Sequence, residues 1–173
     1  MWYESSNWFV GIISGLISSA CFFMILFFIK PKIIVSNSIC KSTNENGETI
    51  YKVKIVNKTR SMLVDVNYSL FYKTIHDDGI DSLVEIEPYK SPLKYVSQYN
   101  TSESKSDDYA VRITYLIKEE DFPINDNTRL VFSFMASHQT TGTTKAISKE
   151  YSKKEIKEGL FETGVSTKIL EKR

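Results

Sequence analysis

The feature that most limits how this chain can fold is an apolar run from Trp8 to Ile29. The run spans 22 residues and contains no Asp, Glu, Lys, Arg or His. As an α-helix it would be about 33 Å long, enough to cross the hydrocarbon core of a bilayer. The sequence therefore predicts an extracytoplasmic tail of residues 1–7, a single transmembrane helix over residues 8–29, and a soluble domain of residues 30–173. Aromatic residues lie around the start of the run, as in an interfacial belt: Trp2, Tyr3, Trp8 and Phe9.

A cleaved signal peptide is the competing interpretation of this run. Signal peptides begin with positive charge, whereas the first seven residues carry Glu4 and no Lys or Arg. The run is also longer than the apolar core of a typical signal peptide, and no Ala-x-Ala-like cleavage site follows it. These features favour an anchor that stays in the membrane.

The charges that flank the run predict its orientation. Lys30, Lys32 and Lys41 follow it closely, and positively charged flanks stay on the cytoplasmic side. We therefore expect the short N-terminal tail outside and the C-terminal domain in the cytoplasm, at the cell inner membrane. Cys21 falls within the run, so Cys40 has no partner for a disulfide inside the domain.

Small residues follow one stripe of the predicted helix. Gly11, Gly15 and Ser19 recur every four residues, and Ser14 and Ser18 form a parallel row. Because small side chains let membrane helices approach closely, the first row predicts a helix-packing seam. The alternative is that Gly and Ser are simply common in membrane helices. A further hypothesis is that Ser14 and Ser18 face an aqueous pore, although a Ser hydroxyl can instead bond to its own helix.

Beyond the run, apolar and polar residues alternate over short segments separated by turn residues, which is typical of half-buried strands. Asn46-Gly47 is the strongest hairpin signal, residues 76–79 form a further predicted turn, and residues 89–108 a long loop. Ser152 and Glu155 fit a capping box, which predicts a short helix that ends by Gly159. The predicted strands are residues 33–41, 49–57, 62–73, 83–87, 109–118, 129–137, 144–151 and a last one within 160–170.

This pattern predicts a mainly β fold, in which a β-sandwich follows the helix. We expect its core to include residues from four of the predicted strands: Val53, Val64, Val66, Ile113, Phe132 and Phe134.

The charge of the domain is nearly balanced. All 22 Lys and Arg residues, and every one of the 21 Asp and Glu residues except Glu4, lie in residues 30–173, which gives a formal charge of +2. This balance argues against general nucleic-acid binding, which needs a strongly basic surface. His76 and His138 are isolated, no Cys pair has metal-ligand spacing, and no catalytic motif occurs. We therefore expect no catalytic residues, no enzyme activity, no metal and no cofactor.

The C-terminal third carries a more specific signal in Phe134-Met-Ala136, the turn Thr141-Gly142-Thr143-Thr144, and the residues from Tyr151 to Phe161. These residues resemble the end of the cytoplasmic domain of inward-rectifier potassium channels. That family closes an immunoglobulin-like sandwich with a Thr-Gly turn, a strand and a Glu-Ile-x-x-Gly-x-Phe segment. The resemblance covers residues 32–162 in layout and is specific only within residues 134–161.

The resemblance implies an immunoglobulin-like β-sandwich, assembly as a homo-oligomer (a tetramer in the family), and ligand-responsive coupling of the sandwich to the helix. Lys30 and Lys32 lie where the family binds anionic lipid headgroups, which implies membrane lipid as a partner, although topology alone explains two lysines beside a helix equally well. The chain departs from the family in having one helix and no Thr-x-Gly-Tyr/Phe-Gly filter. It is therefore not a potassium channel of that type.

Two functional hypotheses follow. In the first, an oligomer couples binding of a ligand or partner by its β domain to a transmembrane helix bundle. Such a bundle could act as a small pore or membrane effector, for example in bacterial stress or antiviral defence. In the second, the protein is a membrane-anchored scaffold that recruits another protein, and the helix is only an anchor.

Overall fold

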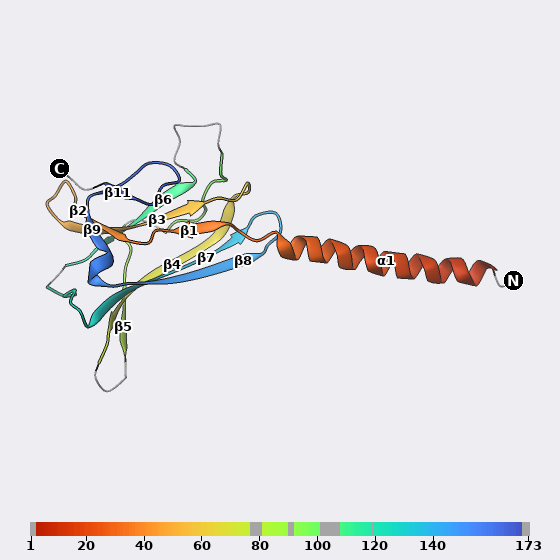
Figure 1. Ribbon diagram of the computed structural model, residues 1–173, viewed down its shortest axis with the longest axis horizontal. Helices are drawn as coiled ribbons and strands as arrows, with labels where there is room; N and C mark the ends of the chain where they lie inside the picture. The colour runs from red at the N-terminus through yellow and green to blue at the C-terminus, as the bar shows by residue number, and fades with distance from the viewer. Residues whose placement is uncertain (1–2, 77–80, 90–91, 101–107, 119, 171–173) are drawn as a thin grey trace.

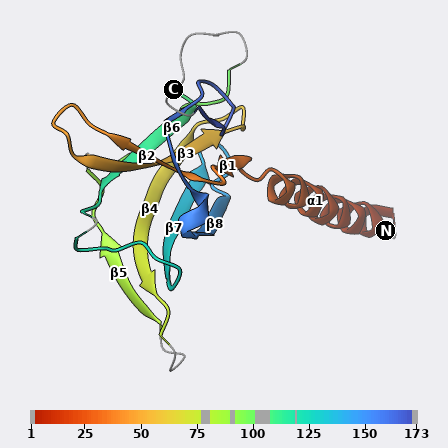
Figure 2. The ribbon, with the colours of Figure 1, turned by 60° about the vertical axis from the view of Figure 1, so that its left-hand side comes forward.

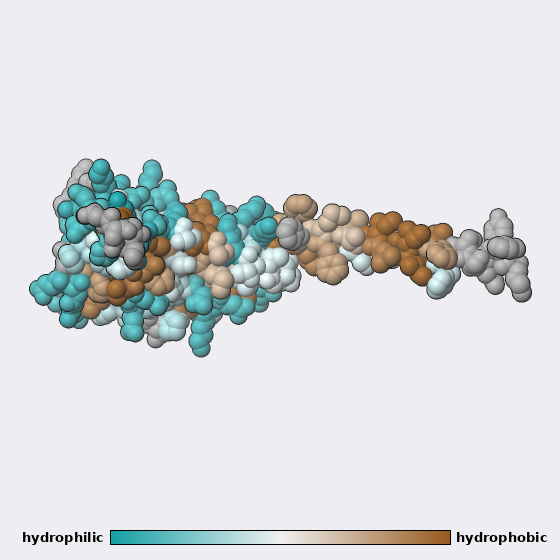
Figure 3. All heavy atoms as spheres, turned by 90° about the horizontal axis from the view of Figure 1, so that it is seen from below, coloured by the Kyte–Doolittle hydropathy of each residue, from teal (hydrophilic) through white to brown (hydrophobic). Residues whose placement is uncertain are grey.

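Residues 3–76, 81–89, 92–100, 108–118 and 120–170 are described by a computed structural model, drawn as a ribbon in Figure 1. One helix, α1 (Tyr3–Phe28), extends from one end of a β-rich domain. Its segment from Trp8 to Leu26 is long and apolar enough to cross a membrane, and the domain buries none of it. Figure 3 shows the same contrast on the surface, where a hydrophobic helix leaves a largely hydrophilic domain. The predicted apolar helix is confirmed; Trp2, most of the turn at 76–79 and residues 101–107 lie outside the described part.

The first sheet is built around β3 (Thr49–Asn57), which pairs along its whole length. On one side β6 (Ala110–Leu116) is antiparallel to it, from Ile50↔Leu116 to Val56↔Ala110. On the other side β1 (Ile33–Val35) and β2 (Ile39–Thr43) pair with it one after the other. The last strand of this sheet, β9 (Ile156–Glu158), does not contact β3; it pairs in parallel with β2 and forms the edge of the sheet.

The second sheet has the order β5-β4-β7-β8 and is antiparallel throughout. Its strands are β4 (Leu63–Thr74), β5 (Ser82–Ile86), β7 (Thr128–His138) and β8 (Thr144–Tyr151). A small hairpin of β10 (Leu160–Phe161) and β11 (Ile169–Leu170) ends the described chain. The curvature of the two main sheets is plain in Figure 2.

Both main sheets contribute to one hydrophobic core. Val53, Ile113, Phe132 and Phe134 are buried in it, as the alternation predicts, and Val66 packs against it. Burying a side chain of this size stabilises the fold by about 1.5–3 kcal/mol. The alternation therefore identifies the inward face of β6 and β7, whereas β3 is buried on both faces and its Lys54 is fully buried.

The core prediction for Val64 is wrong, because a β-bulge interrupts β4. The register with β7 shifts between Val64 and Asn67, and Asp65 adopts a φ of 50°. A bulge adds one residue to one strand, so it exchanges the inward and outward positions on either side. Leu63 is fully buried in place of Val64.

Two predicted segments are also divided differently in the structure. The expected strand 33–41 is broken into β1 and β2 by residues 36–38. The capping box does form: the Glu155 carboxylate accepts from the Ser152 backbone amide at 2.7 Å, and the Ser152 hydroxyl also donates to that carboxylate at 2.9 Å. It starts only a single 3-10 turn, η1 (Lys153–Glu155), after which the chain joins the first sheet as β9. The helix expected to reach Gly159 is therefore wrong: edge pairing with β2 replaces it.

Side chains of β8 hold the break between β1 and β2. The Lys149 ammonium donates to the Val35 carbonyl at 2.7 Å, and the Tyr151 hydroxyl donates to the Ser36 carbonyl at 2.8 Å. Burial lowers the pKa of Lys149 and raises that of Tyr151. These contacts tie the edge of the second sheet to the first, just beyond the residues that follow the helix.

Candidate functional site

The candidate site is a groove where the helix meets the β domain, which we call the junction groove. It has a volume of about 650 Å³. Three segments far apart in the sequence enclose it: the residues after α1, the β3–β4 turn and the β7–β8 turn. The lining residues are Phe28, Ile29, Lys30, Lys32, Lys58, Thr59, Arg60, Ser61, His138, Thr140 and Thr141.

The end of α1 is fixed by its own chemistry and by the domain. Pro31 has no backbone N–H and cannot continue a helix, and its side chain is buried. The carbonyl of Ile29 would be left without a helical partner. It accepts a hydrogen bond from the Thr143 hydroxyl at 2.7 Å and a longer one from the Thr141 hydroxyl at 3.5 Å. The β7–β8 turn therefore caps the carbonyl of the residue that follows α1.

The β7–β8 turn holds its hydroxyls in place through its backbone. His138 N–H donates to the Thr143 carbonyl at 2.9 Å, and Gly142 N–H to the His138 carbonyl at 2.8 Å. Gly142 has a φ of 67°, which residues with a side chain rarely adopt. The hydroxyls of Thr141 and Thr143 also lie 2.8 Å apart and bond to each other. The turn thus presents a fixed pair of hydroxyls to the helix end.

The β3–β4 turn is held from beneath by Asn57, which is fully buried. The Asn57 amide donates to the carbonyls of Ser61 and Ser97, both at 2.9 Å, and its oxygen accepts from the Thr59 amide at 2.8 Å. This turn forms hydrogen bonds with both the N–H and the carbonyl of Lys32. Lys32 N–H donates to the Thr59 hydroxyl at 2.8 Å, and the Lys32 carbonyl accepts from Lys58 N–H at 2.7 Å.

The junction groove is strongly basic. Lys30, Lys32, Lys58 and Arg60 are all exposed on its lining, and none of its lining residues is acidic. The remaining polar lining consists of Ser and Thr hydroxyls and the buried ring of His138. Four cations beside hydroxyl groups are the kind of side chains that recognise an anion with several oxygens, such as a phosphate ester.

Sequence reasoning identified only half of this cationic set. The resemblance to the channel family points to Lys30 and Lys32 as lipid-headgroup residues, and both line the groove. Lys58 and Arg60 were not predicted, because they follow a strand 26 or more residues later and look like ordinary turn residues. The Thr-Gly turn was noticed for its resemblance to a channel family, but nothing local in the sequence shows that it contacts Ile29.

The residues predicted on the helix lie away from the groove. A Cβ added at Gly11 or Gly15 would meet nothing within 4 Å, so the fold of a single chain does not require glycine at either place. Ser18 and Ser19 are exposed on the same helix. The Ser14 hydroxyl donates to the Gly11 carbonyl at 3.0 Å, so it is satisfied within its own helix.

Among the described residues, no group of three or more His, Cys, Asp and Glu side chains could hold a metal ion. Cys40 is fully buried, its thiol lies 2.9 Å from the Gly159 carbonyl, and burial raises its pKa. A thiol of this kind is poorly reactive.

Comparison with known protein families finds no match, and comparison with characterised proteins finds none either.

Proposed function

We propose that this chain is a single-pass membrane protein whose β domain couples the binding of an anionic ligand to the packing of its transmembrane helix. One observation carries the proposal. The end of the helix is hydrogen-bonded to the domain on two sides, by Thr143 at Ile29 and by the β3–β4 turn at Lys32. A helix that served only as an anchor would need no such attachment.

The attachment favours coupling between the helix and the β domain because no flexible linker separates them. Only residues 29–32 separate α1 from β1, and both neighbours of Pro31 in this segment, Lys30 and Lys32, line the groove. Each hydrogen bond at the junction contributes about 0.5–1.5 kcal/mol. Two such attachments on different sides resist rotation of the helix relative to the domain, so a shift of either turn is passed to the helix.

Charge supports the orientation with the domain in the cytoplasm. The fold adds Lys58 and Arg60 to the two lysines that directly follow the helix. Positive charge near a membrane segment is retained on the cytoplasmic side. We therefore place the domain in the cytoplasm at the cell inner membrane, with the N-terminal tail outside.

The ligand that we propose for the junction groove is the headgroup of an anionic membrane lipid. A helix that crosses the bilayer places the groove at the headgroup level, where a surface lysine or arginine gains about 1 kcal/mol from anionic lipid. The groove combines four such cations with hydroxyl donors. Phosphate esters are recognised by this combination.

On the membrane side, we propose that several copies form a helix bundle through Gly11, Gly15 and Ser19. The open space at both glycines leaves room for a second backbone. We propose that Ser14 and Ser18 face the interior of that bundle. Of the two, Ser18 is the better candidate to contact water there, because the Ser14 hydroxyl already donates to the Gly11 carbonyl. The β domain beneath would then be an immunoglobulin-like sandwich that assembles with its copies.

The test compares helix function with anchoring. Gly15→Leu puts a bulky side chain into the proposed seam, and we expect it to abolish ion leakage or growth arrest while membrane insertion and domain folding persist. Ile17→Leu, at an exposed position of the same helix that already carries a bulky residue, is the matched control. Replacement of residues 8–29 by an unrelated monomeric membrane helix should also abolish activity. Full activity of that chimera would instead establish the scaffold hypothesis.

Binding at the junction groove is tested separately. Anionic phosphatidylglycerol added to the detergent-solubilised full chain should raise its Tm, and the double variant Lys58→Ala/Arg60→Ala should lose most of that rise. Lys118→Ala/Lys168→Ala removes two exposed lysines outside the groove and should keep it. An equal rise in Tm for both double variants would contradict a headgroup site in the groove.

A further inference from the structure

Two edges of the β domain carry opposite charge. On β5 and just after it, Glu85 and Glu87 are exposed. On η1 and β9, exposed lysines lie close together in the chain: Lys153, Lys154 and Lys157, with Glu158 as the exposed acid beside them. The two edges, which we call the acidic edge (β5) and the basic edge (η1–β9), belong to different sheets.

Within the described part of the chain, both edges leave strand backbone without a partner. β5 ends the order β5-β4-β7-β8, and β9 ends the order β1-β3-β2-β9. β5 also exposes apolar side chains, since Leu83 is 59% and Val84 49% exposed. Leu160, which follows β9, is 55% exposed. An exposed edge strand with apolar side chains is a template for pairing with another strand.

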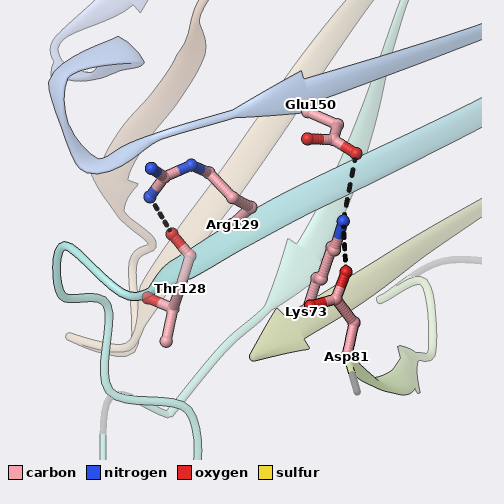
Figure 4. A network of polar contacts seen from close by, with 5 residues as sticks. All are labelled: Lys73, Asp81, Thr128, Arg129 and Glu150. Carbon is pink, nitrogen blue, oxygen red and sulfur yellow. Dashed lines mark hydrogen bonds and ion pairs between the residues drawn. The ribbon is translucent and has the colours of Figure 1, made fainter. Parts of the chain in front are cut away.

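The acidic edge is held firmly in place. Lys73 on β4 lies 2.8 Å from the Asp81 carboxylate at the start of β5 and 3.6 Å from that of Glu150 on β8 (Figure 4). Five register pairs also join β5 to β4. The contact with Lys73 offsets the charge of Asp81, so the negative charge of this edge comes from Glu85 and Glu87. The edge is a fixed strand of the sheet and is available for docking as it stands.

The positions of the two edges suit contact between copies in one membrane. Copies anchored by their helices share one orientation, so they can be related only by rotation about the membrane normal. Surfaces that meet under this rotation must lie at the same height. β5 and β9 both lie in the half of the domain away from the helix, while Figure 2 places β5 and β8 on opposite sides of the second sheet, and η1 follows β8 directly.

We propose that the acidic edge of one copy docks on the basic edge of a second copy, head to tail, so that identical chains close into a ring beneath the membrane. The inference rests on the membrane anchoring given under Proposed function and goes beyond it by naming the contact. Head-to-tail contacts close into rings when the rotation between copies closes. Pairing of two acidic edges would instead bring Glu85 and Glu87 against their own copies, which like charge disfavours.

The small size of these edges is compatible with a specific contact. An exposed ion pair alone contributes little to the affinity of a contact. Anchoring in one membrane raises the effective concentration of the copies, and a bundle contact and an edge contact made by the same two chains reinforce each other. The two edges then only need to determine which surfaces of neighbouring copies meet; they do not have to hold the copies together on their own.

Cross-linking of the full chain in membranes tests the contact. Two differently tagged chains, both carrying Cys21→Ser, are co-expressed, one with Glu87→Cys and the other with Lys154→Cys, and treated with a short thiol cross-linker. We expect a mixed-tag dimer from this pair and none above background from Glu87→Cys with itself. Lys118→Cys with Lys168→Cys, two exposed positions outside both edges, gives the background.

Charge reversal provides the second arm. In co-purification of the two tagged full chains, Glu87→Lys alone and Lys154→Glu alone should each lose the partner, and the two changes combined in one chain should restore it. Restoration also shows that both altered chains fold. A mixed-tag dimer at background level, equal cross-linking of Glu87→Cys with itself, or retention of the partner in both single variants would overturn the ring. Cross-linking with no ion leakage would leave the ring standing and refute the coupling function alone.

Discussion

Thr143→Val tests the coupling of helix and domain with the smallest possible change. The substitution keeps the size of the side chain and removes the hydroxyl that donates to the Ile29 carbonyl at 2.7 Å. A hydrogen bond of this kind contributes about 0.5–1.5 kcal/mol, and Thr143 is partly exposed. We therefore expect Thr143→Val to destabilise the attachment of the helix end to the domain by about 1 kcal/mol. This corresponds to about a fivefold decrease in the ratio of molecules with the attachment formed to molecules with it broken. The domain as a whole should remain folded.

Hydrogen exchange measures this change at a site that the substitution does not touch. The Lys32 amide donates to the Thr59 hydroxyl on the other side of the helix end. If the junction opens as one unit, the Lys32 amide should exchange about fivefold faster in Thr143→Val, in the full chain held in lipid nanodiscs. Thr144→Val is the matched control, because the Thr144 hydroxyl pairs with Ser137 at 3.0 Å and not with the helix. Unchanged exchange at Lys32, or equal acceleration in both variants, would refute the coupling argument.

Three further predictions concern the domain. Phe134→Ala should lower the free energy of unfolding by about 3–5 kcal/mol in urea titrations, because Phe134 is fully buried, whereas Met135→Ala at its exposed neighbour should change it by about 0.5 kcal/mol or less. The buried Tyr115 hydroxyl has no hydrogen-bond partner in the described structure, so Tyr115→Phe should raise the Tm at pH 7, while Tyr151→Phe should lower it through loss of the bond to Ser36. Burial raises the pKa of the Tyr115 and Tyr151 hydroxyls, so as the pH rises the unfolded chain loses these protons before the folded chain does. The free energy of unfolding should therefore fall above about pH 10. Thermal melts at alkaline pH should show a less steep fall in Tyr115→Phe and in Tyr151→Phe.

The sequence predicts the bounds of three long strands closely, and β7 shows most clearly why. β3 and β8 have the predicted bounds, and β7 differs by one residue at each end. In β7 the buried and partly exposed positions alternate from Thr128 to Phe134 without a break. This alternation is a local property of the chain, because each side chain simply points to one face or the other. Period-2 patterns of this kind can therefore be read without knowing the neighbouring strands.

Where the prediction fails, tertiary contacts decide the structure. The bulge at Asp65 leaves no mark in the alternation of β4, which continues unbroken in the sequence. The segment after Ser152 carries a genuine helix-start signal, and the signal does form its hydrogen bonds. The free edge of β2 then provides partners for three residues, which a second helical turn at the surface could not match. A local pattern cannot report the presence of an edge that is about a hundred residues away.

The candidate site was predictable only in the part that adjoins the helix. Topology rules single out Lys30 and Lys32 because these residues follow the membrane segment directly. The other side of the site comes from Thr143, more than a hundred residues later, and from a β3–β4 turn that Asn57 holds in place. No periodicity or motif links these segments. Only the pairing of β1 with β3, and of β4 with β7, brings them together.

In the proposed function, Lys32 is the residue at which binding and coupling meet. Its backbone N–H and carbonyl both form hydrogen bonds with the β3–β4 turn, and the residue lines the junction groove. A headgroup bound by its ammonium would therefore act on a backbone that is hydrogen-bonded to this turn. Ile29, three residues earlier, is held by the β7–β8 turn, which belongs to the other sheet. The short segment between these two residues is attached to both sheets, so any ligand that changes the spacing of the turns must also change the angle at which the helix leaves the domain.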